Sequence, residues 1–404
     1  MFNDGWGLYA IAGWQEQHQF RLSVPRKEYE QLVRQFNPTR FDPDAWLDLA
    51  EAAGMKYLCF TTKHIDGFCL WDTKQTDYSV MNIPYGKDVL AMLANACHRR
   101  GFPLCVYYSI ADMHHSNYPN AGRNYELPRP DAGDEPNLEK YLAFVKAQVH
   151  ELCTQYGEIG GFWWDANVIE HRDPSFNALI RSLQPTAVIN NRGFDQGDFG
   201  TPERDYDASS NDVPVFDGPT EACQSIGMES WGYRTDEDYY SDAYLIRSID
   251  MTLAKGGNYL LNVGSRADGV FPAEGVRILQ VIGQWYRRVG ESFAGTKPDP
   301  SLTTNRDVLV TRKGNTLFIH LVASVVGDRV LLPPIHRFPQ EAILLNTGQP
   351  VAASLDVLPG NYATQEQVLR LYRLPVNKLS GTVAVIRLTL DADNFPRELQ
   401  AVRI

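Results

Sequence analysis

The sequence predicts an α/β fold, a (β/α)-barrel of the TIM type, followed by a C-terminal all-β sandwich. Two observations lead to this fold class. Over about the first 290 residues, short apolar runs alternate with longer amphipathic runs, which is typical of βαβ units and a parallel sheet. Beyond them the helical period disappears, and short alternating runs separated by turns replace it. We therefore expect a barrel domain over residues 1–297 and a β-sandwich domain over residues 298–404.

The barrel strands are expected at six apolar runs: residues 5–13, 56–63, 103–110, 160–166, 186–192 and 258–263. Helices are expected between them, each running from a capping Asp, Asn or Ser to a glycine, at residues 42–54, 88–101, 137–157 and 241–257. A barrel is favoured over an open doubly wound sheet because no glycine fingerprint for phosphate binding is present. Since a regular barrel has eight strands, this one is either irregular or contains two strands that the runs do not reveal.

The C-terminal part shows a different pattern. Its apolar runs are short, alternate with polar residues and are separated by regular turns, at residues 307–323, 329–334, 341–351 and 382–390. None of them has a convincing helical period, so we expect antiparallel strands packed as a small sandwich.

The composition is that of a globular protein and excludes some partners. Of the 404 residues, 44% are hydrophobic and 22% are charged, and the net charge is −11. Nucleic acids and anionic membranes are therefore not expected partners, because either would need a basic surface. The first residues lack a basic segment followed by an apolar run, which predicts a cytoplasmic protein, or a secreted one if a leader was removed. The oligomeric state stays open, and a homo-oligomer is compatible with the sequence.

Chemically active side chains gather at the expected carboxyl ends of the strands. In a barrel these ends face the active site. The third to fifth runs deliver Tyr107, Trp163, Asp165 and Arg192 there, and the second run delivers His64. Aromatic rings pack on the apolar faces of sugars, while carboxylates bind hydroxyls, so this combination indicates a sugar pocket. Two tryptophans before Asp165 favour a tuned carboxylate over a solvated strand cap.

Several nearby polar residues have simpler interpretations. Asp66 precedes Gly67 and is expected to shape a turn. Lys63 is expected to pair with a carboxylate without a direct chemical role. His114 and His115 resemble metal ligands, but nothing nearby completes a site, so we expect them on the surface or at the substrate rim. No metal site is predicted.

The motifs together resemble the α-L-fucosidases of glycoside hydrolase family 29. The resemblance covers nearly all of the first 300 or so residues, through FNPTRFDPDAWLDLAEAAGMKYLCFTTKHIDGFCLWDTKQTDYSV, KDVLAMLANACHRRGFPLCVYYS, GGFWWDA, NNRGF with GDFGTPE, and ESWGY with GGNYLLNVGSRADG. It implies a barrel with a C-terminal β-sandwich. It also implies a retaining exo-glycosidase that needs no cofactor and that removes terminal α-L-fucosyl residues from oligosaccharides or glycoconjugates.

The same resemblance assigns roles to individual residues. Asp165 matches the family's nucleophile, and Glu203, in TPE, matches the acid/base of some members. Glu221 is a rival for that acid/base role. The remaining matches are expected to bind the sugar: His64, Tyr107, Trp163, Arg192 and Trp231, and more loosely Trp14 and Glu16.

Two departures from the family bear on the sugar. Gly5 and Ile65 occupy positions where the family has histidines that contact fucose hydroxyls. Each lost hydrogen bond could cost about 0.5–1.5 kcal/mol of binding free energy. Two alternatives therefore stay open: a glycosidase for a related sugar such as α-L-galactose, and a sugar-binding barrel without turnover. Linkage and leaving-group preference also stay open, since they depend on loops such as residues 112–136.

Overall fold

The computed structural model describes residues 2–3, 6–13, 18–204, 215–303, 305–322, 327–333, 338–379 and 381–390. The chain divides into two compact units. The first comprises Met1–Glu203, Cys223–Tyr240 and Leu260–Gln280, and the second comprises Arg204–Ala222, Ser241–Tyr259 and Val281–Ile404. The domain boundary between residues 297 and 298 stays a prediction.

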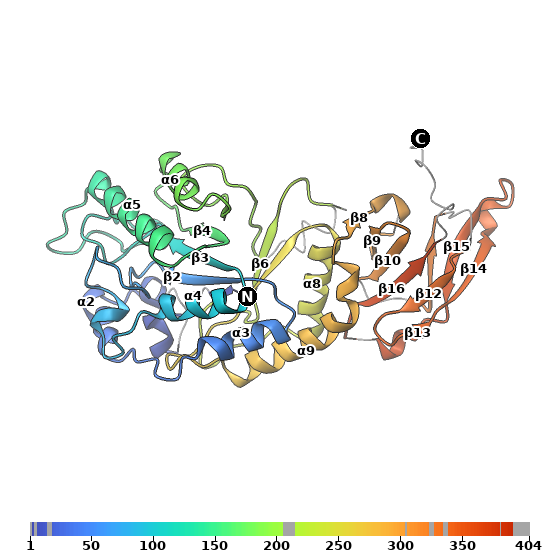
Figure 1. The fold of residues 1–404 in the computed structure, drawn as a ribbon, viewed down its shortest axis with the longest axis horizontal. Coiled ribbons are helices and arrows are strands. Elements are labelled where there is room, and N and C mark those ends of the chain that lie inside the picture. The colour runs from blue at the N-terminus through green and yellow to red at the C-terminus, as the bar shows by residue number, and fades with distance from the viewer. Residues whose placement is uncertain are drawn as a thin grey trace. The chain divides into compact units, whose positions relative to one another are not determined.

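A seven-stranded sheet positions the candidate site. Its strands are β1 (Phe2–Asn3), β2 (Leu58–Lys63), β3 (Leu104–Ser109), β4 (Gly161–Asp165), β5 (Val188–Ile189), β6 (Glu221–Ser225) and β7 (Asn258–Asn262). They lie in the order β5-β4-β3-β2-β1-β7-β6. Figure 1 shows β2, β3 and β4 side by side. The pairs β2–β3 and β3–β4 are parallel, with Cys59 opposite Cys105 and Tyr107 opposite Trp163. All carboxyl ends of such strands meet at one rim.

A short segment, residues 199–203, joins the two edges of this sheet. Phe199 forms a parallel bridge with Asn190, which follows β5, and Glu203 forms a parallel bridge with Cys223 in β6. The segment therefore takes the place between β5 and β6, and eight positions follow one another in chain order around a closed ring. The predicted (β/α)-barrel is confirmed. Beyond the predicted runs, the barrel contains β6 and this closing segment, and its first strand, β1, lies at Phe2–Asn3 and not within residues 5–13.

The barrel helices begin at the predicted caps. The side chains of Asp42, Asp88, Asn137 and Ser241 accept backbone N–H groups at the starts of α3 (Pro43–Ala52), α4 (Val89–Arg100), α5 (Leu138–Gln155) and α8 (Asp242–Ala254). Gly101 ends α4 in a left-handed conformation, with φ of 62°. The other α-helices are α1 (His18–Arg21), α2 (Arg26–Tyr29), α6 (Ser175–Leu183) and α9 (Ala273–Val289). Short 3-10 helices are η1 (Leu8–Ile11), η2 (Glu30–Arg34), η3 (Val80–Asn82), η4 (Gly290–Ser292), η5 (Pro300–Leu302), η6 (Pro359–Asn361) and η7 (Val376–Lys378).

The strand predicted at residues 5–13 is wrong. Phe2–Asn3 forms β1, and within residues 6–13 the structure has the 3-10 helix η1 instead. Leu8, Tyr9 and Ala10 are all buried there. An apolar run that is buried on every side shows neither the helical nor the strand periodicity. A strand and a short buried helix therefore cannot be distinguished from the sequence alone.

The second unit contains the predicted antiparallel sandwich. One sheet has the order β13-β12-β16-β10-β9-β8 and the other has the order β11-β15-β14. Their strands are β8 (Lys297–Pro298), β9 (Val308–Lys313), β10 (Thr316–Leu321), β11 (Arg329–Leu332), β12 (Glu341–Leu344), β13 (Gln349–Pro350), β14 (Ala352–Val357), β15 (Gln367–Tyr372) and β16 (Ala384–Thr389). Alternate side chains such as Ile319, Leu369 and Ile386 are fully buried in one apolar core that both sheets share.

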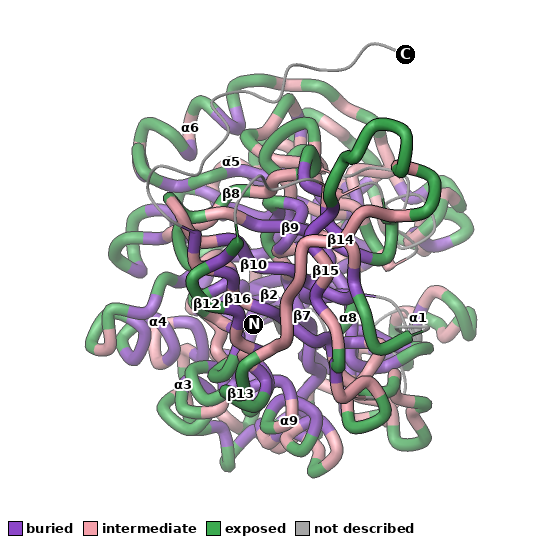
Figure 2. Tube along the Cα trace, turned by 90° about the vertical axis from the view of Figure 1, so that its right-hand side faces the viewer, coloured by how far each residue is buried: buried purple, intermediate pink, exposed green. Residues whose placement is uncertain are grey.

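The barrel strands are more deeply buried than the helices around them. In Figure 2, β2 is buried along its length, whereas α3 and α4 each have exposed positions. In the part of the chain that the structure describes, none of the helices combines the length and the apolar character that crossing a membrane would require. The six cysteines are free thiols.

Candidate active site

The carboxylate of Asp165 lies where β4 ends. The four preceding strand residues are buried, and the Asp165 side chain keeps 25% of its surface exposed. Asn190, which follows β5, fixes this strand end, because its side-chain amide accepts from the Trp164 N–H and donates to the Trp164 carbonyl, at 2.8 and 2.9 Å. Ala166 follows in a left-handed conformation with φ of 53°, which few non-glycine residues adopt. The chain therefore turns sharply after Asp165 and leaves its carboxylate open at the rim.

Arg192 connects Asp165 with Glu203. Its Nη1 lies 3.2 Å from Asp165 Oδ1 and 2.7 Å from Glu203 Oε2. Because the two oxygens share one nitrogen, they can be at most 3.2 plus 2.7 Å, or 5.9 Å, apart. Retaining glycosidases place their two carboxyl groups about 5–5.5 Å apart, whereas inverting enzymes need about 6.5–9.5 Å. This pair of carboxylates therefore fits the retaining geometry.

Thr201 holds the arginine in this orientation. Arg192 Nε donates to the Thr201 hydroxyl at 2.7 Å, and Nη2 donates to the Thr201 carbonyl at 2.9 Å. The same hydroxyl donates onward to Asn191 Oδ1 at 3.2 Å. Burial opposes the charge of Arg192, but the negative charges of Asp165 and Glu203 outweigh it and raise the pKa of the guanidinium. Arg192 is therefore a fixed cation between two acids.

The second oxygen of Asp165 is held by an aromatic side chain. The Tyr107 hydroxyl donates to Asp165 Oδ2 at 2.9 Å. With Arg192 on Oδ1 and Tyr107 on Oδ2, both oxygens have a donor and the carboxylate cannot rotate freely. Such fixed donors suit a group that must attack in one direction.

Predicted sugar-binding residues line the barrel beside this pair. Three rings form a row with Tyr107 in the middle. Tyr107 stacks with Trp163 on one side and with His64 on the other, and each pair of ring centroids is 5.7 Å apart. Arg192 lies over the Trp163 ring at 4.8 Å. Trp231 is buried in the same cluster of residues as Tyr107 and Trp163. The structure thus brings together five of the predicted substrate-binding residues with both carboxylates.

Glu203 and Glu221 occupy different places. Glu203 ends the closing segment, opposite Cys223, and its side chain is 40% exposed. Glu221 is the first residue of β6, two residues before Cys223 in the chain, and it is buried. The active sites of such barrels lie at the carboxyl ends of the strands. Glu203, at the end of its segment, therefore lies nearer this rim than Glu221, at the start of β6.

Lys63 and Asp66 make the contacts that their simpler interpretations predict. Lys63 Nζ pairs with Asp112 Oδ2 at 2.8 Å, and both side chains are buried. Asp66 Oδ1 accepts from the Phe68 N–H at 3.1 Å across a turn in which Gly67 has φ of 79°. Neither Lys63 nor Asp66 contacts Asp165 through any bond that the structure describes.

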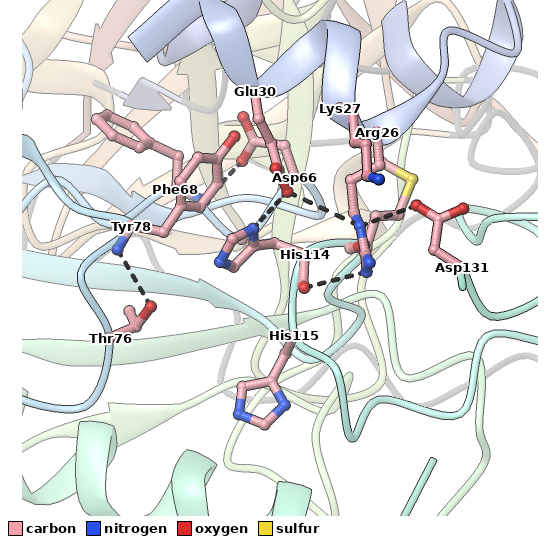
Figure 3. A network of polar contacts seen from close by, with 12 residues as sticks. Arg26, Lys27, Glu30, Asp66, Phe68, Thr76, Tyr78, His114, His115 and Asp131 are labelled. Carbon is pink, nitrogen blue, oxygen red and sulfur yellow. Dashed lines mark hydrogen bonds and ion pairs between the residues drawn. The ribbon is translucent and has the colours of Figure 1, made fainter. Parts of the chain in front are cut away.

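The two adjacent histidines brace a loop. His114 Nδ1 lies 2.6 Å from Glu30 Oε1, and its ring stacks on Tyr78 (Figure 3). His115 packs against Phe144 with ring centroids 4.2 Å apart. Within the described ranges, no group of three or more His, Cys, Asp or Glu side chains is placed to hold a metal ion.

Some sequence predictions fall beyond what the structure describes. Trp14, Glu16 and Gly5 lie outside the described residues, so their proposed places in the sugar pocket stay predictions. Ile65 is described and buried.

Thr201 and Tyr125 were missed by the sequence interpretation. The role of Thr201 could not be recognised from the sequence, because a threonine beside a proline usually indicates only a turn. Tyr125 lies in the loop of residues 112–136, where no periodicity predicts a position. Burial, and after it the negative charges of Asp165 and Glu203, raise the pKa of its hydroxyl. The one available signal was the presence of aromatic residues in a long loop after a barrel strand.

Comparisons with known proteins agree with this geometry. The family model described as "Alpha-L-fucosidase" matches residues 5–291. The chain is 31% identical to the solved alpha-L-fucosidase isoenzyme 1 from Paenibacillus thiaminolyticus, with a TM-score of 0.84 over 97% of this chain and 96% of that one. It is also 25% identical to the tissue alpha-L-fucosidase of Bos taurus over 355 residues, which are 78% of this chain and 72% of the relative.

A further solved relative was captured during reaction. It is an alpha-L-fucosidase from Bacteroides thetaiotaomicron, trapped as a covalent intermediate in complex with 2-fluoro-fucosyl fluoride by means of a glutamate-to-glutamine mutant. The chain is 26% identical to it, with a TM-score of 0.78 over 96% of this chain and 93% of that one.

Proposed function

Because the chain belongs to the α-L-fucosidase family and is a retaining glycoside hydrolase, we propose that Asp165 and Glu203 perform its double displacement on α-L-fucosides. The observation that supports these roles best is the shared contact with Arg192, which limits the separation of the two carboxylate oxygens to 5.9 Å, from 3.2 and 2.7 Å. The proposed substrate is a fucosylated oligosaccharide or glycoconjugate.

In the first step, an Asp165 carboxylate oxygen bonds to the anomeric carbon while the bond to the glycosidic oxygen breaks. Glu203, in its protonated form, gives its proton to the departing oxygen. The products of this step are a fucosyl ester of Asp165 and the released alcohol. Arg192 and Tyr107 hold Asp165 so that one oxygen can approach the sugar, and their hydrogen bonds stabilise it again when it leaves.

In the second step, a water oxygen attacks the anomeric carbon and the bond to Asp165 breaks. The Glu203 carboxylate accepts the proton of that water, so both side chains return to their starting states. Two inversions at the same carbon give net retention. Arg192 contacts Glu203 as well, and it therefore supplies positive charge next to both acids throughout the cycle.

Glu221 is a second candidate for the acid/base role, because burial is one means by which enzymes tune a general acid. Position supports Glu203 more strongly. Glu203 shares Arg192 with Asp165, whereas the register places Glu221 two residues before the level of Glu203 on β6.

A panel of 4-nitrophenyl glycosides tests the proposed function. We expect the highest kcat/KM on the α-L-fucoside, and proton NMR should show α-L-fucose as the first product before it mutarotates. A faster reaction on the α-L-galactoside would assign a different sugar. β-L-Fucose as the first product would contradict the two-carboxylate retaining scheme, and no turnover of any glycoside would favour a sugar-binding protein.

A further inference from the structure

All five N–H donors of Arg192 have acceptors within the described part of the chain. Nε donates to the Thr201 hydroxyl at 2.7 Å, and Nη2 donates to the Thr201 carbonyl at 2.9 Å and to Cys223 Sγ at 3.7 Å. Nη1 contacts Asp165 Oδ1 at 3.2 Å and Glu203 Oε2 at 2.7 Å. A guanidinium carries five N–H groups in a planar fork, so these five contacts leave none for a sugar hydroxyl.

The acceptor on Nε has a defined orientation. A hydroxyl carries one proton, and that of Thr201 is donated to Asn191 Oδ1 at 3.2 Å. A lone pair of the same oxygen is therefore available to the Arg192 Nε–H. The ring of Trp163 covers one face of the guanidinium, at 4.8 Å. Arg192 was predicted to bind the sugar, but these contacts favour a role in which it connects other groups.

The closing segment that carries Thr201 is anchored just before it begins. The Asp198 N–H donates to the Ile189 carbonyl at 2.6 Å, and Asp198 Oδ2 accepts from the Ile189 N–H at 2.8 Å. Asp198 therefore binds both backbone groups of the last residue of β5. Its other oxygen, Oδ1, pairs with Arg181 of α6 at 2.9 Å.

Close backbone contacts hold the segment on both sides. A Cβ atom at Gly197 would overlap the Asn190 carbonyl oxygen, so the chain lies against the residue after β5 more closely than a side chain would permit. On the β6 side, the Cys223 N–H donates to the Pro202 carbonyl at 3.0 Å. Thr201 is thus presented to the arginine by a rigid support.

We propose that Thr201 is a positioning residue of the reaction and acts through Arg192. It sets the gap between the nucleophile, Asp165, and the acid/base, Glu203, while Arg192 makes no hydrogen bond to the sugar. This inference rests on the proposed function. Because one nitrogen of Arg192 contacts both carboxylates, a rotation of the guanidinium would disturb both acids at once. Retaining hydrolysis depends on their separation in both of its steps.

The test uses variants that distinguish positioning from a merely structural role. Thr201→Val keeps the shape and the carbonyl but removes the hydroxyl, whereas Thr201→Ser keeps the hydroxyl. Arg192→Lys keeps the positive charge but lacks the fork that contacts Thr201. Thr186→Val is the matched control, since Thr186 also lies beside a proline, is exposed and donates to Glu158 Oε1 at 3.2 Å.

We expect Thr201→Val to lower kcat on an activated aryl α-L-fucoside by about 10- to 100-fold, because small misplacements of reacting groups slow the chemical steps. KM and the Ki of L-fucose, which binds without reacting, should stay within about twofold of wild type. Thr201→Ser should recover most of kcat, and Thr186→Val should leave it unchanged. In the Arg192→Lys background, Thr201→Val should cause little further loss, because Thr201 acts through that arginine.

Several results would overturn this inference. They are a wild-type kcat for Thr201→Val, an equal fall for Thr201→Ser, and independent losses that multiply in the double variant. If Thr201→Val does not fold, Arg192→Lys alone decides. An unchanged Ki of L-fucose with a lowered kcat would support positioning, whereas a raised Ki would make Arg192 a sugar ligand. A wild type without turnover on any glycoside would contradict the proposed function, and this inference with it.

Discussion

Replacing Asp165 by glycine or asparagine should abolish turnover while the protein stays folded. The covalent intermediate cannot form without this carboxylate, and loss of a nucleophile typically lowers kcat by about 10³- to 10⁶-fold. The side chain is partly exposed at a strand end, so its removal opens no cavity in the core. Rates on an activated aryl α-L-fucoside and the thermal unfolding midpoint measure the two parts of this prediction.

Asparagine is the sharper of the two variants, because it preserves size, its amide oxygen can still accept from Arg192, and its NH2 group can donate to the Tyr107 hydroxyl. Asp195→Asn is the matched control, since Asp195 pairs with the exposed Arg172 on the surface. Glycine adds a stereochemical test. Azide can enter the space left by Asp165 and attack the sugar directly, which should give the inverted β-L-fucosyl azide. A near-wild-type rate for Asp165→Asn would show that another residue is the nucleophile.

The second large effect is expected at Glu203. Glu203→Ala should lower kcat/KM by about 10²- to 10⁴-fold on substrates whose leaving group needs a proton, and much less on activated aryl fucosides. Azide should restore turnover of the activated substrates, because a small anion attacks the fucosyl-enzyme without a general base. The product should be the retained α-L-fucosyl azide, the opposite anomer from that of the Asp165 variant.

Glu221→Ala and Glu221→Gln separate the two glutamates. Glu221 is buried at the start of β6, so we expect its variants to lose stability and to show no azide rescue. Rescue of Glu221→Ala together with no response from Glu203→Ala would reverse the assignment. The variant that azide rescues identifies the acid/base even if both variants are slow.

The sequence predicted the parts of the fold that depend on local signals. The helix caps at Asp42, Asp88, Asn137 and Ser241 act within one turn of the chain, so their residue types are sufficient evidence. Asp165 was predictable because a charge at the end of an aromatic strand is costly without a partner. The missed strand β6 reads EACQS, which contains no β-branched residue, and the closing segment 199–203 is recognisable only from its partners, Asn190 and Cys223.

The candidate site was predictable to a similar extent. The strand ends place His64, Tyr107, Trp163 and Arg192 at one rim by topology alone. The contacts that make them a site depend on distance in space: Nη1 of Arg192 lies between two acids, and the Thr201 hydroxyl accepts from Nε. No spacing in the sequence encodes these contacts, because each joins different segments of the barrel.

Covalent trapping tests the central claim, that Asp165 is the nucleophile of a retaining fucosidase, most directly. The wild-type protein is incubated with 2-fluoro-fucosyl fluoride, whose fluorine at C2 slows hydrolysis of the glycosyl ester, and is then analysed by intact mass and by peptide sequencing. We expect one 2-fluoro-fucosyl unit per chain, attached to Asp165 in the peptide that contains β4, and no label on Asp165→Asn. A label on Glu203, Glu221 or any other side chain would contradict the assignment of Asp165.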